Sequence, residues 1–214
     1  MLELIQAVPF AFAALFPVVN PIGSSIIFLT LANGSSRQEL NKLSAKISIY
    51  VTVMLTVVLF IGSWILRLFG ITLPIVLIGG GLVLAYIGWQ LLNKPDAAPL
   101  SNGSGSAALD KDIDKMSFYP LTMPVTAGPG CIAVTIALGA HGVSSSLKIT
   151  LLNQLGNSIG VLLVGVTVFF CYRYAYTITN KLGSSGMQVI MRLAAFINFC
   201  IGLELMWHGA SYLL

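Results

Sequence analysis

Two clusters of proline and glycine lie inside apolar segments of this 214-residue chain. At these clusters the backbone N–H and carbonyl groups could be free to bind a ligand. In the first cluster, Pro17 and Pro21 each lack a backbone N–H and clash with the carbonyl four residues earlier. Asn20 directly precedes Pro21, which disfavours helical geometry and predicts an extended backbone there. Gly23 then lets another backbone approach closely. The sequence therefore predicts a helix that is broken near Asn20.

The second cluster repeats the first at a fixed distance along the chain. The pair Phe16-Pro17 aligns with Tyr119-Pro120, which lies 103 residues later, and another proline follows four residues after each. Residues 123–130 add further prolines and glycines, so this segment is more disruptive still. A duplicated pair of helix breaks is predicted, and kinks that serve only packing are the alternative.

Broken helices can bind a ligand without using charged side chains. A break leaves carbonyl oxygens free on one side and N–H groups on the other, and the start of the following half-helix has a positive partial charge. Those N–H groups suit a carboxylate, and the carbonyl oxygens suit an ammonium group. At membrane depth, irregular backbone persists only where it lines a cavity or is buried in protein. The pattern indicates a site for a zwitterion.

The composition places these breaks in a membrane. Hydrophobic residues make up 57% of the chain and charged residues 8%, against roughly 25% charged in a typical globular protein. A single compact core cannot hide so much apolar surface from water. This excludes a soluble enzyme, a disordered chain and a nucleic-acid-binding module, despite the formal net charge of +4.

Six apolar segments are long enough to cross a bilayer, which takes about 20 helical residues each. They are expected at residues 5–31, 45–66, 71–92, 118–139, 147–170 and 189–212. Helix is the expected state because every backbone polar group in lipid must be bonded within its own segment, and the strict alternation of barrel strands is absent. The predicted fold class is an all-α membrane protein.

A hydrophilic stretch divides the chain into two halves of three segments each. Residues 1–92 form the first three-helix repeat, residues 93–117 a flexible linker, and residues 118–214 the second repeat. Three spans is an odd number, so the second repeat would be inverted, an arrangement that places binding sites at mid-membrane. Lysine and arginine gather after the first, third and fifth segments, which predicts a cytoplasmic linker and both termini outside.

Few polar side chains interrupt the segments. Asn153 and Asn157 share a face of the fifth segment, and Asn157 could either turn toward the broken helices or bond one helix to another. In the sixth segment, Arg192 lies near the cytoplasmic end, where its side chain can snorkel. Glu204 and His208 share a face near the outer end, where they could relay protons or simply lie at the interface.

The sequence carries no catalytic or cofactor signature. It lacks Gly-x-Ser-x-Gly, His-Glu-x-x-His and a phosphate-binding loop, so neither enzymatic activity nor a cofactor or metal site is expected. The three cysteines lie far apart in apolar surroundings and are expected to pack. A secondary transporter is the leading interpretation. Its rivals are a broad-specificity drug or metabolite exporter or channel, and a non-transporting membrane assembly factor.

The motifs Asn20-Pro21-Ile22-Gly23 and Met123-Pro124, the latter followed by Gly128-Pro129-Gly130, resemble those of the MarC family of bacterial inner-membrane proteins. That family includes the SnatA-type transporters of small neutral amino acids and is grouped with the LysE-like exporters. The resemblance covers all six segments. It implies proton-coupled transport of glycine, alanine and similar amino acids, with the substrate held by discontinuous first and fourth helices.

Carried onto this sequence, the resemblance points to a substrate site shared by the two breaks. With Ser24 and Asn157 included, the candidate residues are Asn20, Pro21, Gly23, Ser24, Thr126, Gly128, Pro129, Gly130 and Asn157. The expected partners are the amino acid, protons and the lipid bilayer, and glycine-rich helix surfaces are compatible with a homodimer. Alternating access of two inverted halves is the predicted mechanism.

Overall fold

Every regular element in the described part of the chain is a helix. The structure is a computed structural model that describes residues 2–32, 34–93, 113–142 and 146–213. Its elements are α1 (Leu2–Val19), α2 (Pro21–Leu31), α3 (Arg37–Leu68), α4 (Leu73–Leu92), α5 (Ile113–Met116), η1 (Ser117–Thr126), α6 (Pro129–His141), α7 (Leu147–Arg173) and α8 (Ala175–Ser211). Most of the predicted linker, residues 93–117, lies outside the described residues.

Five helices are long and apolar enough to cross a membrane, and a bent pair brings the number to as many as six. The five are Leu4–Leu31, Arg37–Leu68, Leu73–Leu92, Leu147–Arg173 and Ser185–Ser211. The bent pair joins η1 to α6 at an angle of 70°. The spans and the bent pair overlap the six predicted segments, which confirms an all-helical membrane protein.

Two helix boundaries differ from the prediction for identifiable reasons. Helix α3 begins at Arg37, well before residue 45, because Ser36 and Glu39 form a reciprocal capping box. Its two hydrogen bonds, from the Ser36 N–H to Glu39 Oε2 and from the Glu39 N–H to Ser36 Oγ, measure 2.6 and 3.3 Å. Helix α8 begins at Ala175, not near residue 189, and is kinked at Gly183, whose φ of 65° suits glycine.

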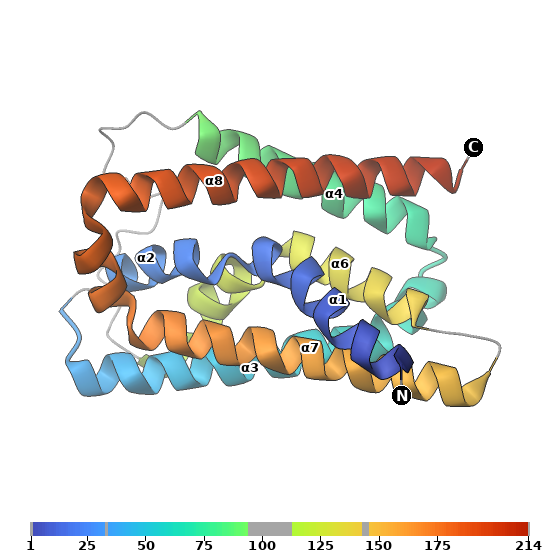
Figure 1. Ribbon diagram of the computed structural model, residues 1–214, viewed down its shortest axis with the longest axis horizontal. Helices are drawn as coiled ribbons and strands as arrows, with labels where there is room; N and C mark the ends of the chain where they lie inside the picture. The colour runs from blue at the N-terminus through green and yellow to red at the C-terminus, as the bar shows by residue number, and fades with distance from the viewer. Residues whose placement is uncertain (1, 33, 94–112, 143–145, 214) are drawn as a thin grey trace.

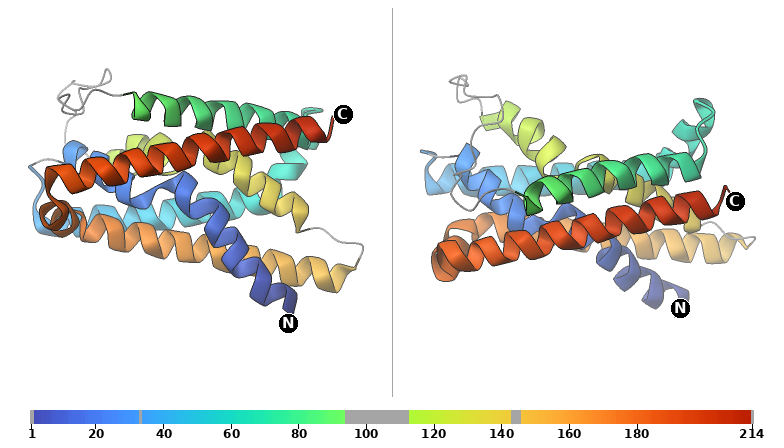
Figure 2. Two further views of the ribbon diagram at one scale, coloured as in Figure 1. Left: turned by 45° about the horizontal axis from the view of Figure 1, so that its top comes forward. Right: turned by 90° about the horizontal axis from the view of Figure 1, so that it is seen from above.

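The helices form two outer pairs with the interrupted elements between them (Figure 1). Helix α4 packs along α8, and α3 packs along α7. The segments α1–α2 and η1–α6 lie between these pairs and contact both (Figure 2). The two chain termini lie at one end of the molecule, and the end of α4 that leads toward the linker lies at the other. The two breaks therefore lie between the two helix pairs.

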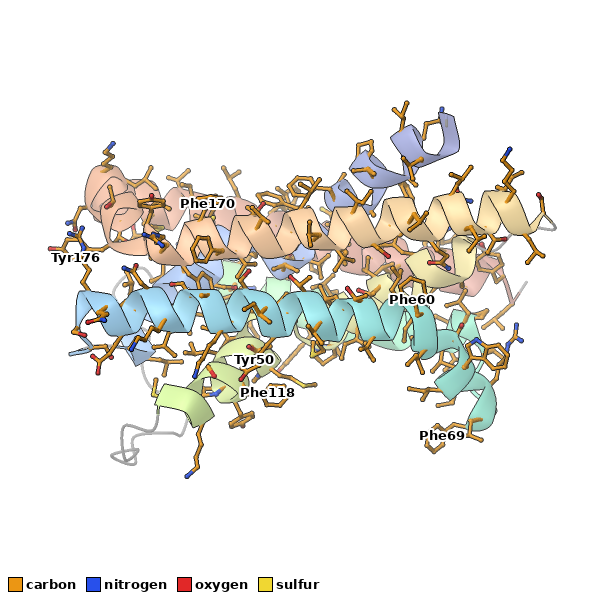
Figure 3. The ribbon with its side chains drawn as sticks, turned by 90° about the horizontal axis from the view of Figure 1, so that it is seen from below. Tyr50, Phe60, Phe69, Phe118, Phe170 and Tyr176 are labelled. Atoms are coloured by element: carbon orange, nitrogen blue, oxygen red, sulfur yellow. The ribbon has the colours of Figure 1, made fainter. Side chains whose placement is uncertain are left out.

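The outer surface is apolar, as a lipid-facing surface must be. Phe60, Phe69, Phe170 and Tyr176 point outward from α3, the turn after it, α7 and α8, and each is roughly half or more exposed (Figure 3). Exposed side chains of this size are costly in water but match the hydrocarbon of a bilayer. The fold thus has an apolar exterior.

Glycine lets α4 and α8 approach each other closely. A Cβ atom at Gly81 would lie 2.5 Å from the carbonyl oxygen of Gly202, and one at Gly88 would lie 2.7 Å from the backbone nitrogen of Phe199. Gly79, on another face of α4, has nothing within 4 Å. The glycines of α4 therefore form a packing surface against α8 at Gly81 and Gly88.

Candidate functional site

The first helix break is centred on Asn20, which has φ 46° and ψ 59°. The expected extended backbone is thus wrong: Asn20 adopts the left-handed conformation, which asparagine tolerates better than most residues. Its side-chain oxygen accepts a hydrogen bond of 3.2 Å from the Gly23 N–H and so caps α2. This cap helps to offset the strain of the backbone turn.

Ser24 connects the two breaks. Its hydroxyl lies 3.2 Å from the carbonyl oxygen of Val19 and 3.2 Å from that of Val125, which is 101 residues further along the chain. The first carbonyl belongs to the last residue of α1, and its usual helical donor, the Gly23 N–H, bonds to the Asn20 side chain instead. One buried hydroxyl group therefore lies within hydrogen-bonding distance of a backbone carbonyl oxygen from each half of the chain.

The second break separates η1 from α6. Within η1, Tyr119 and Met123 have extended backbone angles, and each precedes a proline. Helix α6 then begins at Pro129, with Gly128 as an extended N-cap residue. The first N–H groups of α6, from Gly130 onward, have no partner within the helix, so this end has a positive partial charge.

A buried hydroxyl contact holds the end of η1. Thr126 Oγ1 donates to the carbonyl oxygen of Leu121 at 2.6 Å and lies 2.7 Å from the Tyr172 hydroxyl. The ring of Tyr172 stacks on that of Phe28, with 4.8 Å between centroids. All four residues are essentially inaccessible to solvent. The cluster ties η1, α2 and α7 together beside the break.

A cavity of about 130 Å³ lies where the two breaks meet. It is bordered by α1, α2, α4, the break between η1 and α6, and α8. Its lining residues are Val18, Val19, Asn20, Gly23, Ser24, Ile27, Leu84, Ile87, Leu91, Pro124, Val125, Thr126, Gly128, Pro129, Gly130, Cys131, Met191 and Asn198. No Asp, Glu, Lys, Arg or His stands among them, so polarity comes from backbone groups, hydroxyls and amides. We call this the central cavity.

The structure brings most of the predicted site residues to the central cavity. From the first break come Asn20, Gly23 and Ser24, and from the second come Thr126, Gly128, Pro129 and Gly130. Pro21 is buried at the start of α2 but does not line the cavity. The two clusters, far apart in sequence, thus meet at one place.

Asn157 does not line the central cavity. Its side-chain N–H₂ donates to the carbonyl oxygen of Leu138 at 3.1 Å, and Gln154 donates to that of Gly139 at 2.9 Å. Asn153 reaches the Gly142 carbonyl at 3.4 Å. These amides of α7 bond carbonyl groups at the C-terminal end of α6 and at Gly142 just after it, where the Leu138 carbonyl also accepts from the Gly142 N–H. Here Asn157 bonds one helix to another, and it borders a separate cavity of about 260 Å³.

Asn198 is a cavity residue that the sequence reasoning missed. It lies halfway along the span Ser185–Ser211, is 4% exposed and borders the central cavity. Its side-chain oxygen is buried and finds no hydrogen-bond partner within the described part of the chain. The sequence does show a single amide between Ile197 and Phe199. Because a polar side chain inside a span is energetically costly, this amide could have been predicted to have a functional role.

Arg192, Glu204 and His208 of α8 do not line the central cavity. Arg192 is exposed near Met191 and does not line the cavity. Glu204 and His208 form a pair with 3.3 Å between Oε1 and Nε2, and their side chains are 67% and 60% exposed. Across the described residues, no group of three His, Cys, Asp or Glu side chains is placed to hold a metal ion.

Comparison with known proteins identifies the family. The model of the MarC family integral membrane proteins matches residues 5–214. The chain is 31% identical over 212 residues to the UPF0056 inner membrane protein MarC of Escherichia coli O1:K1, covering 98% of this chain and 96% of that protein. It is 30% identical over 215 residues to the protein of the same name from Salmonella typhimurium, with the same coverage. No solved structure matches the chain. The chain therefore belongs to the MarC family of multi-pass inner-membrane proteins.

Proposed function

We propose that the protein is a secondary transporter of small neutral amino acids such as glycine and alanine, of the SnatA type within the LysE-like exporters. The observation that carries the proposal is the central cavity, which is bordered by both helix breaks and by no Asp, Glu, Lys, Arg or His. A zwitterion can bind there through peptide N–H groups and carbonyl oxygens alone. At about 130 Å³, the cavity is well below the roughly 300–1,000 Å³ of pockets for drug-sized ligands.

The proposed mechanism is alternating access by two inverted three-helix repeats with discontinuous first and fourth spans. The predicted equivalents α3 and α7 pack together, as do α4 and α8, which is the arrangement expected about a pseudo-two-fold axis. Larger cavities lie beyond the central one: about 870 Å³ near Arg37 and Tyr174, and about 240 Å³ near Leu77 and Tyr212. We assign them as the entrances on the linker side and the terminal side.

Tyr172 and Phe28 are the proposed barrier on the linker side. Tyr172 borders the 870 Å³ cavity, and its hydroxyl contacts Thr126, which borders the central cavity. Its ring stacks on Phe28, so the two aromatic rings fill the space beside this contact. A rotation of this pair would join the two cavities. With the linker cytoplasmic, this barrier faces the cytoplasm.

Uptake by purified protein in liposomes tests the proposed function. Labelled glycine or alanine should enter with saturation kinetics, and an imposed pH gradient should drive accumulation if protons are coupled. A channel would give flux without saturation, and an exporter of apolar drugs would transport those compounds in preference to amino acids. No uptake of any amino acid across a panel of substrates and pH gradients would refute the proposal.

Alanine substitutions at the second break locate the transported substrate. A Cβ atom at Gly130 would lie 3.0 Å from Leu84 Cδ1, and one at Gly128 would lie 3.2 Å from the Pro124 carbonyl oxygen. Both contacts force neighbours that line the cavity to move. Gly128→Ala and Gly130→Ala should therefore reduce glycine uptake several-fold. Full activity of both variants would place the substrate elsewhere.

A further inference from the structure

The amide of Asn198 is an unusual feature of the central cavity. Its oxygen is buried and has no hydrogen-bond partner among the described residues, which is unfavourable for an acceptor. Burial of Asn157, by contrast, is compensated by a hydrogen bond to Leu138. An uncompensated acceptor on a residue that borders a cavity is explained if a small movement of the side chain lets a ligand supply the donor.

The other polar groups of the cavity suggest which donor that is. The start of α6 offers N–H groups and a positive partial charge at Gly130, on the side of the cavity made by the second break. Asn198 lies on α8 and adds an oxygen with negative partial charge. A cavity with a positive and a negative polar site, and no Asp, Glu, Lys, Arg or His, complements a molecule with one anionic and one cationic group.

We propose that Asn198 Oδ1 accepts a hydrogen bond from the ammonium group of the substrate, while the first N–H groups of α6 bind its carboxylate. This assignment rests on the proposed transport of amino acids and extends it to a specificity-determining side chain. It requires an ammonium group on the substrate. A carboxylic acid without an amine, such as propionate, would leave the Asn198 oxygen unpaired and would bind poorly.

Substitution of Asn198 gives the direct test, with labelled glycine as the probe in liposomes. Asn198→Leu keeps the size but removes the acceptor, and should raise the KM for glycine at least about tenfold. Asn198→Asp keeps an acceptor oxygen and should stay closer to wild type than Asn198→Leu. Ile197→Leu, on the exposed face of the same helix turn, is the matched control and should leave the KM unchanged. If Asn198→Asp loses uptake as fully as Asn198→Leu, the acceptor role is wrong.

A competition experiment on the wild-type protein covers the case in which the leucine variant does not fold. Alanine and N-methylglycine are isomers that carry a methyl group on carbon or on nitrogen. Alanine should compete with glycine at least about tenfold more strongly than N-methylglycine, and propionate should not compete. Equal competition by the two isomers and by propionate would overturn the role of Asn198.

Uptake by the wild-type protein and by Asn198→Leu separates the transport function from the role of Asn198. If the wild-type protein takes up no amino acid, the proposed function falls and the assignment of Asn198 falls with it. If the wild-type protein transports glycine and Asn198→Leu has the same KM, only the assignment of Asn198 falls.

Discussion

Thr126 Oγ1 lies 2.7 Å from the hydroxyl oxygen of Tyr172, and this contact joins the second helix break to the end of α7. Thr126 already donates its single hydroxyl proton to the Leu121 carbonyl. The Tyr172 hydroxyl must therefore be the donor in the contact between them. This direction makes the two partners unequal, because loss of the acceptor leaves the buried Tyr172 O–H group with only the Ser24 side chain as a partner, whereas loss of the donor leaves no O–H group unpaired.

Substitution of the two partners should reveal that inequality. Thr126→Val removes the acceptor of the Tyr172 hydroxyl and should lower the free energy of unfolding by about 1–3 kcal/mol. Tyr172→Phe removes the donor together with the group that needed it, and should cost about 1 kcal/mol. Denaturation in detergent measures both values. The exposed Tyr174→Phe is the control. A larger loss for Tyr172→Phe than for Thr126→Val would reverse the assignment of the donor.

The left-handed conformation of Asn20 predicts an order among its variants. Asn20→Gly keeps access to positive φ and should lose only a few tenths of a kcal/mol for the cap. Asn20→Ala loses the cap and also strains the backbone, and should cost about 2 kcal/mol. Thermal unfolding in detergent should therefore rank wild type above Asn20→Gly, and Asn20→Gly above Asn20→Ala. If alanine is tolerated as well as glycine, the turn at Asn20 is not left-handed.

The contact between α4 and α8 allows a matched pair of glycine substitutions two residues apart. Gly81→Ala would place its methyl group against the Gly202 carbonyl and should cost about 1–3 kcal/mol. Gly79→Ala meets nothing within 4 Å and should be neutral or stabilising by up to about 1 kcal/mol, since alanine favours helix. Unfolding of the two variants in one detergent makes the comparison. Equal destabilisation would indicate a general helix effect and not a close contact.

The exposed pair of Glu204 and His208 predicts a small effect of neutralisation. Pairs four residues apart on an exposed helix face contribute about 0.3–0.5 kcal/mol. Glu204→Gln should therefore change stability by no more than that, and it should preserve uptake driven by a pH gradient because the pair lies outside the central cavity. If glycine exchange persists but the pH gradient no longer drives uptake, Glu204 belongs to the proton path.

The positions of the spans could be predicted from the sequence, because lipid imposes length and apolarity on each of them. The helix breaks were also predictable, since Pro21 and Pro129 remove backbone donors wherever they occur. The conformation at Asn20 was not, because the steric effect of the following proline and the side-chain cap on α2 favour different backbone angles. Only the folded structure shows that the cap prevails.

The cavity residues also include some that could be predicted from the sequence and some that could not. Residues near each break, such as Gly23 and Gly128, were found because their types disturb a helix. Asn198 was not predicted, because a single amide does not change the local structure of an apolar helix. Its position at the cavity depends on how α4, α6 and the two breaks pack around it. Asn157 shows the reverse case, since its partner is the Leu138 carbonyl at the end of α6, which the helix pattern alone could not reveal.

The amides that α7 supplies to the end of α6 have a mechanical consequence. Asn157 and Gln154 tether the carbonyl groups of Leu138 and Gly139, so the far end of this short helix is anchored to its long neighbour. The near end, at Gly128, has extended backbone angles and no side chain. Along its length α6 also packs against α3 and α4, so a tilt of α7 would strain these two amide hydrogen bonds and, through them, the helix whose first residues border the central cavity.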